Sequence, residues 1–165
     1  MKLSPQIILI TLVLVVIGVL VASRYRSRPR QAEFKTTDEM MRWLATEAVD
    51  IAAKNGVGLD FSTQSIEQVE MVLAKLHQEF IRTKPAGGAN GLAMAFGAYI
   101  GEAIRRSEPD AHWERDDPVG GEKSYPLRWS AGSSFVCAWC YRRLTVGEED
   151  NVWYKFVALQ QRAEQ

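Results

Sequence analysis

The chain has 165 residues, and its 20 basic and 20 acidic residues give a formal net charge of zero. The charges are divided unevenly: residues 1–35 contain six basic residues and one acidic residue, net +5, whereas residues 36–165 contain fourteen and nineteen, net −5. An acidic segment of about 130 residues is long enough for one hydrophobic core and short for two domains. Because this segment has no basic stripe, we expect no nucleic-acid partner.

The N-terminal region contains a long apolar run. Residues 7–22 read IILITLVLVVIGVLVA, sixteen positions without a charged side chain. A membrane-spanning helix needs about 17–25 residues, a length that the uncharged stretch reaches when it is counted from Leu3. We therefore predict a transmembrane anchor over residues 1–23, in contact with the lipid bilayer through residues 3–23. A signal peptide cleaved near Ala22 is the alternative.

A basic flank follows the apolar run directly. Its members are Arg24, Arg26, Arg28 and Arg30. The positive-inside rule puts this flank on the cytoplasmic side of the membrane. We expect residues 24–35 to form a basic linker and residues 36–165 a soluble domain on the cytoplasmic side of a single-pass protein.

Two amphipathic helices are predicted after the linker, because apolar residues recur there at helical spacing. Thr36 and Glu39 fit a capping box at the start of the first helix, which we expect to end at Asn55. The second helix is expected to begin after a cap at Ser62 or Thr63 and to end before a proline.

A third helix is predicted over residues 90–106. Small residues recur at every fourth position and form a ridge of Ala89, Ala93, Gly97 and Gly101. Two interior glycines cost up to about 1 kcal/mol each relative to alanine. We therefore expect another part of the backbone to pack closely against this ridge, which would make the helix central to the fold.

Short strands are predicted next, over residues 112–115 and 125–129. Pro126 favours an edge position for the second of these strands, because proline cannot donate to a ladder. The two strands form a short antiparallel β element.

Two C-terminal helices complete the prediction. The first covers residues 135–146 with a cap at Ser133 or Ser134, although its β-branched and aromatic residues make a strand the alternative. The second covers about residues 150–162. The predicted fold class is α+β: a mainly helical small domain with a short antiparallel β element.

One resemblance extends over about residues 60–160. The string GAYIGEAIRR is followed by HWERDD and YPLRWSAG. This order resembles an uncharacterised bacterial domain family whose members share a Gly-Ala-Tyr-x-Gly-Glu helix, a downstream tryptophan, and helices followed by short strands and then helices. The resemblance implies a bacterial protein with a partner-binding or immunity-like role, and it implies no particular activity. The membrane anchor lies outside the resemblance.

Four residues are candidates for a polar binding pocket: Tyr99, Glu102, Trp113 and Arg128. A carboxylate on a central helix can act as a general base if burial raises its pKa, so a small enzyme with a pocket around Glu102 is one hypothesis. The alternative is a salt bridge from Glu102 to an arginine that stabilises the fold. No nucleophile or set of metal ligands accompanies the carboxylate, which favours the structural interpretation.

The only two cysteines form a C-x-x-C motif, Cys137 and Cys140. A redox role needs the first thiol at a helix N-terminus with a lowered pKa, and the thioredoxin pattern also has a surrounding βαβ unit that is absent here. Buried packing is therefore favoured over thiol redox chemistry. The two histidines, His77 and His112, do not complete a zinc site, so we predict neither a metal nor a cofactor.

These patterns together predict a membrane-tethered, non-catalytic domain that binds a partner protein. The expected location is the bacterial inner membrane, with the domain in the cytoplasm. The alternatives are a small enzyme with a pocket around Glu102 and a C-x-x-C thiol redox protein.

Overall fold

The computed structural model of the chain describes residues 34–85, 88–130 and 132–163. The chain divides into two units, Met1–Phe34 and Lys35–Gln165, and all the elements named below belong to the second. The predicted membrane anchor and its four flanking arginines lie outside the described residues. Within the described part of the chain, no helix is both long and apolar enough to cross a bilayer.

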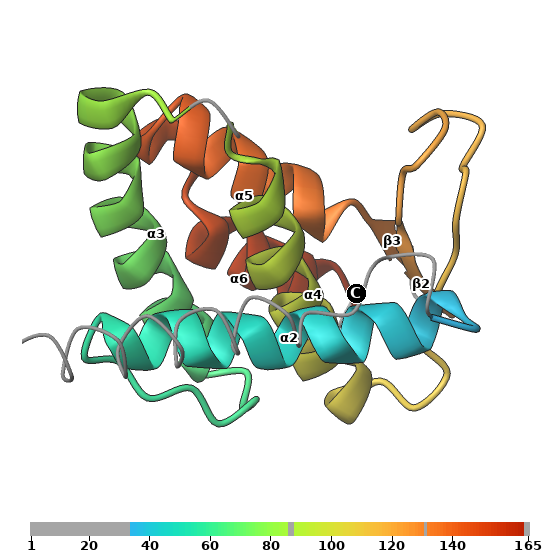
Figure 1. The fold of residues 1–165 in the computed structure, drawn as a ribbon. Coiled ribbons are helices and arrows are strands. Elements are labelled where there is room, and N and C mark those ends of the chain that lie inside the picture. The colour runs from blue at the N-terminus through green and yellow to red at the C-terminus, as the bar shows by residue number, and fades with distance from the viewer. Residues whose placement is uncertain (1–33, 86–87, 131, 164–165) are drawn as a thin grey trace, which may run out of the picture. The chain divides into compact units, whose positions relative to one another are not determined.

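The second unit has the α+β fold class that the sequence predicts. Its described residues form five α-helices, one short 3₁₀ helix and a three-stranded antiparallel sheet (Figure 1). In chain order the elements are α2 (Thr37–Lys54), α3 (Ser65–Thr83), α4 (Asn90–Ser107), β1 (His112–Trp113), β2 (Leu127–Trp129), β3 (Gly132–Ser134), α5 (Val136–Thr145), η2 (Glu148–Asp150) and α6 (Val152–Ala163).

Helix α2 begins where the capping box predicts. The Thr36 hydroxyl accepts a hydrogen bond from the Glu39 amide at 3.1 Å, and the Glu39 carboxylate accepts one from the Lys35 amide at 3.0 Å. The carboxylate thus bonds one residue before the cap, where the usual capping box bonds the cap amide itself. The buried face of α2, which includes Met41 and Ala48, packs against α4.

Helix α3 begins slightly later than its predicted cap. Gln64 occupies the cap position and makes no side-chain capping bond, so the predicted cap at Ser62 or Thr63 is wrong in position. The Ser62 hydroxyl nevertheless accepts a hydrogen bond from the Ser65 amide at 3.2 Å. It therefore satisfies one of the amides at the helix start that has no partner within the helix.

Helix α4 is the central helix, and its small-residue ridge packs closely. The predicted backbone contact occurs at Gly97, whereas a tryptophan ring covers Gly101. The helix contacts α2 and α5. A Cβ added at Gly97 would lie 2.4 Å from the Cα of Cys137 in α5, and one added at Gly101 would lie 2.1 Å from the ring of Trp113 in β1. Both distances are well below van der Waals contact, so glycine alone fits at these two positions. Close packing offsets the low helix propensity of the two glycines.

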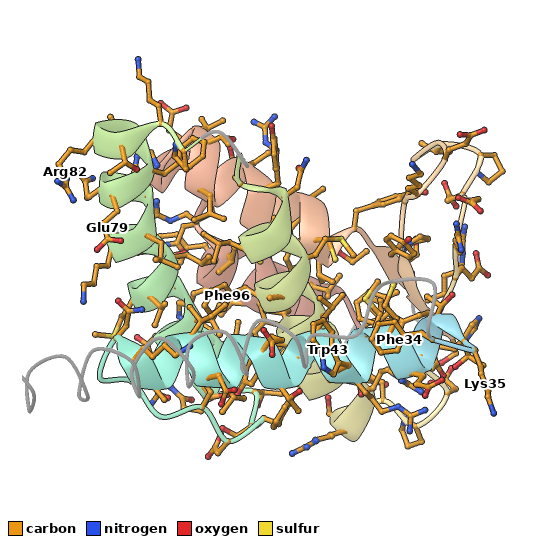
Figure 2. The ribbon with its side chains drawn as sticks, viewed as in Figure 1. Phe34, Lys35, Trp43, Glu79, Arg82 and Phe96 are labelled. Atoms are coloured by element: carbon orange, nitrogen blue, oxygen red, sulfur yellow. The ribbon has the colours of Figure 1, made fainter. Side chains whose placement is uncertain are left out.

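The hydrophobic core draws side chains from all the helices. Phe96 points from α4 toward α3 (Figure 2) and is fully buried. The other large side chains that are fully buried include Met41 from α2, Ile66 and Leu73 from α3, Tyr99 and Ile100 from α4, Leu127 from β2, Leu144 from α5 and Val152 from α6. One continuous core therefore supports the whole unit.

Strand β2 is the central strand of the sheet, which has the order β1–β2–β3. Trp113 of β1 pairs with Leu127, and the last residue of β2 pairs with Gly132 of β3. The predicted edge position is therefore wrong. Pro126 lies just before the strand, where no ladder donor is lost, and its carbonyl accepts a hydrogen bond from the Glu114 amide at 3.0 Å.

Strand β3 is absent from the predicted elements. Its sequence, GSS, has little strand propensity, and it pairs only because β2 lies beside it. The predicted serine cap of the next helix is also wrong, because Ser133 and Ser134 belong to β3 and Phe135 occupies the cap position. Helix α5 itself is confirmed as a helix. Helix α6 starts at Val152, because Glu148–Asp150 form the short helix η2 first.

Candidate functional site

The four residues predicted to form a pocket lie in three separate places. Glu102 and Trp113 meet, whereas Tyr99 bonds to Ser65 of α3 and Arg128 bonds to Asp117 in the loop between β1 and β2. The hydrogen bonds of the described residues therefore tie these side chains into the fold at three sites and do not gather them around one cavity.

Glu102 accepts two hydrogen bonds through the same oxygen. The Trp113 indole N–H donates at 2.9 Å, and the Arg105 guanidinium donates at 2.9 Å. Arg105 also bonds to Asp38 of α2 at 3.2 Å and to the carbonyl of Ala111 at 3.0 Å. The Glu102 side chain is 13% exposed. The Glu102 carboxylate thus connects α4 to β1 directly and to α2 through Arg105. A salt bridge that stabilises the fold is the alternative to catalysis given in the sequence analysis.

Tyr99 is fully buried. Its hydroxyl accepts a hydrogen bond from the Phe61 amide at 2.7 Å and lies 2.5 Å from the Ser65 hydroxyl. The Phe61 ring stacks on Tyr99 with centroids 4.6 Å apart, and the Arg106 guanidinium lies 4.1 Å from the Phe61 centroid. Burial raises the pKa of Tyr99. The residue fixes the α2–α3 connection and stays protonated at neutral pH.

Arg128 lies opposite His112 in the sheet and forms ion pairs with Glu114 and Asp117. The Asp117 carboxylate also accepts hydrogen bonds from two amides of its own loop, those of Val119 at 2.8 Å and Gly120 at 3.0 Å. These amides, together with Arg128, hold the pKa of Asp117 below its ordinary value of 3.8. The arginine therefore fixes the β1–β2 loop to the sheet.

The two cysteines are free thiols in α5. Cys137 packs against Gly97 of α4, and its burial raises the pKa of the thiol to about 12. Burial also raises the pKa of Cys140 well above its ordinary 9.0. Both groups are thiols at neutral pH, which disfavours nucleophilic or redox chemistry. Among the described residues, no three histidine, cysteine, aspartate or glutamate side chains gather as a metal-ligand set.

An open groove lies between α3 and the turn that joins α5 to α6, a place that sequence analysis did not select. We name it the α3–η2 groove; its volume is about 930 Å³. One wall is formed by α3 residues Met71, Ala74, Lys75 and Gln78, and the other by Val146, Gly147, Glu148, Glu149 and Asn151. The remaining lining residues are the less exposed Glu70, His77 and Arg143.

A buried ion pair forms the base of the groove. The Arg143 Nε donates to one oxygen of Glu70 at 2.6 Å, and the Val152 amide donates to the other oxygen at 2.9 Å. The Arg143 side chain is only 5% exposed, and its Nη1 is buried without a hydrogen-bond partner among the described residues. The pair connects α3, α5 and α6, and removing either charge would leave the other one buried and unpaired.

Two ion pairs of Asp150 stabilise the turn that forms the second wall. Asp150 of η2 accepts a hydrogen bond from Arg142 at 2.9 Å and is also bonded by Lys155 of α6. The bond from Arg142 is the main cause that lowers the pKa of Asp150. Gly147 begins the turn with φ of +120°, a conformation that requires glycine.

His77 is a buried histidine in the groove. Its Nδ1 lies 2.8 Å from the Leu144 carbonyl oxygen, which can only accept, so Nδ1 carries the proton. In the neutral ring Nε2 is then an acceptor, and it has no hydrogen-bond partner among the described residues. Nε2 faces Gly147, where an added Cβ would lie 3.0 Å away. The absence of a side chain at Gly147 leaves this nitrogen uncovered.

Sequence reasoning missed the groove because its walls are far apart in the chain. His77 falls one turn after Leu73 on the buried face of α3, and a histidine at such a position is usually a core residue. The only signal was Gly147, which directly follows the helix predicted over residues 135–146. Its contact with His77 depends on the pairing of α3 with α5, which no local pattern specifies.

No family model, curated protein or solved structure matches this chain.

Proposed function

We propose that this chain is a membrane-tethered, non-catalytic binding domain and that the α3–η2 groove receives a partner protein. As the sequence predicts, the anchor over residues 1–23 and its arginine flank hold the domain at the cytoplasmic face of a bacterial inner membrane. The partner-binding role implied by the resemblance to the bacterial family is part of the same proposal.

The observation that carries the proposal is the combination of exposed apolar side chains with a rigid polar base. Met71 and Val146 are 64% and 50% exposed on opposite walls of the groove. The Arg143–Glu70 ion pair below them fixes the helices that carry the walls. These exposed apolar side chains lie among polar wall residues such as Lys75 and Glu149, and such a mixture of apolar and polar groups is typical of surfaces that bind another protein.

Two further observations support a role without catalysis. Glu102, the candidate general base, is occupied by Trp113 and Arg105. The C-x-x-C thiols have raised pKa values, which is the opposite of what a reactive cysteine requires. The enzyme and redox alternatives therefore have less support than binding.

Two matched substitutions on α3 test the proposal. Met71→Glu places a charge in the groove, whereas Ile81→Glu places the same charge on an exposed apolar residue of the same helix outside it. The full chain is purified from membranes in mild detergent, and co-purifying proteins are quantified by mass spectrometry. We expect Met71→Glu to lose a partner that both the unmodified chain and Ile81→Glu retain.

Circular dichroism of both variants establishes that each is folded. Equal retention of every co-purifying protein by the two variants would contradict the assignment of the groove, and so would equal loss.

A further inference from the structure

We propose that the α3–η2 groove recognises a lysine side chain of the partner protein, with the lysine ammonium donating a hydrogen bond to His77 Nε2. This inference rests on the proposed function and specifies which kind of side chain the groove recognises. It depends on three features of the groove: an unpartnered acceptor, carboxylates beside it, and apolar surface above it.

The acceptor is the first feature. His77 is 7% exposed, lines the groove, and has its tautomer fixed by the carbonyl of Leu144. Nε2 has no hydrogen-bond partner among the described residues, and it is not one of their buried unpartnered atoms, so it is open to the groove. Because Nε2 of the neutral ring is an acceptor, a group that bonds to it from the groove is a donor. A carboxylate cannot fill this role, since it carries no proton at neutral pH.

The charge around the acceptor selects a cation. Glu148 and Glu149 follow Gly147 directly, and their side chains form no ion pair or hydrogen bond among the described residues. Arg143 is neutralised by its contact with Glu70. Lys75 is the remaining cation and lies on the opposite wall, on α3. The wall beside Nε2 therefore attracts a positively charged donor.

The apolar surface selects an ammonium on a long stem. Val146 is adjacent to Gly147 in the same turn, and Met71 lines the same groove from α3. A lysine side chain has an apolar stem of four carbons that can lie on such residues while its ammonium reaches a polar base. Methionine adapts to varied apolar partners, which suits one wall of a binding groove.

The two histidines of the chain make a direct experiment possible. The full chain is prepared in detergent micelles with ¹³C-labelled histidine, which gives ring signals from His77 and His112 only. His112→Gln assigns the two signals. The probe is N-acetyl-lysine amide, and its matched control is N-acetyl-norleucine amide, which has the same four-carbon stem without the ammonium.

We expect the lysine probe to shift the His77 signal saturably, leaving the exposed His112 signal in place, and the norleucine probe to shift neither. In Glu148→Gln/Glu149→Gln the dissociation constant for the probe should rise by about threefold to tenfold. The control pair Glu79→Gln/Glu122→Gln removes the same charge from exposed sites outside the groove and should change nothing; Figure 2 shows Glu79 on the outer side of α3.

Substitution of the acceptor provides a second measurement. In His77→Asn an amide N–H can still donate to the Leu144 carbonyl, but the Nε2 acceptor is removed. Met71 carries a natural reporter methyl in the same groove, so its ¹³C signal replaces that of the histidine. We expect the lysine probe to lose its effect on the Met71 methyl in this variant.

Several outcomes would overturn the inference. If the norleucine probe shifts the His77 signal as much as the lysine probe does, the groove recognises only an apolar stem. If saturating lysine probe causes no shift, the groove does not bind an ammonium. Either result leaves the proposed function standing if Met71→Glu still loses its partner. Conversely, lysine binding with equal partner retention by Met71→Glu and Ile81→Glu would refute the proposed function alone.

Discussion

Asp117 and Asp150 are two buried carboxylates that the fold holds in their charged form. Loop amides and Arg128 lower the pKa of Asp117, and hydrogen bonds from Arg142 and Lys155 lower that of Asp150. A carboxylate whose folded pKa is lowered stabilises the protein above its unfolded pKa, and this stabilisation is lost as the pH falls through the folded value. The loss therefore begins near the ordinary value of 3.8 and increases below it.

Acid unfolding measures this effect. All five tryptophans lie after residue 35, so tryptophan fluorescence of the full chain in detergent reports on this domain alone. We expect the unfolding midpoint in urea to fall as the pH is lowered from about 5 to about 2, and Asp117→Asn to flatten this dependence. Asp50→Asn, which changes an exposed aspartate of α2, is the control. If the pH dependence of Asp117→Asn is parallel to that of the unmodified chain, protonation of Asp117 does not contribute to the loss of stability in acid.

At the scale of the element, α4 connects sequence pattern and packing most directly. The spacing of small residues predicted close contact, and the structure supplies the contacts: Cys137 of α5 over Gly97 and the Trp113 ring over Gly101. The pattern could not identify these neighbours, because spacing within a helix says which face is small and nothing about what covers it.

Substitution at Gly101 tests this packing. Gly101→Leu inserts a side chain where even a Cβ would lie 2.1 Å from Trp113, so we expect a loss of stability of about 1–3 kcal/mol or more. Gly91→Leu is the matched control, because a Cβ at Gly91 in the first turn of α4 meets nothing within 4 Å. Thermal unfolding should show a large drop in midpoint for Gly101→Leu only. Equal midpoints for the two variants would contradict the packing argument.

The remaining elements show where sequence reasoning succeeds and where it fails. The helices follow from local periodicity, and Thr36 caps α2 as predicted, whereas the caps predicted for α3 and α5 are wrong. Strand position does not follow from local pattern: Pro126 indicated an edge strand, yet β2 became central because GSS paired with it. The partners of the candidate binding residues could not be predicted for the same reason. Tyr99 and Arg128 bond to Ser65 and Asp117, partners that depend on tertiary packing.

At the scale of the whole molecule, the proposal combines a predicted anchor with a groove that faces solvent. The basic flank of residues 24–30 and the acidic domain give the two ends of the chain opposite charge. A basic flank binds anionic lipid, whereas a net negative domain is repelled by it. The domain is therefore expected to stay in solution beside the membrane, where its groove is accessible to a partner.

Photo-crosslinking in intact cells tests the central claim, that the groove of the membrane-tethered chain binds a partner, most directly. A photoreactive amino acid replaces Gln78 in the wall of the groove, and in a control chain it replaces the exposed Glu122 of the β1–β2 loop. We predict that the membrane fraction contains a partner protein crosslinked from position 78, that position 122 gives no such product, and that adding Met71→Glu removes it. No product from position 78, or the same product from both positions, would contradict the account.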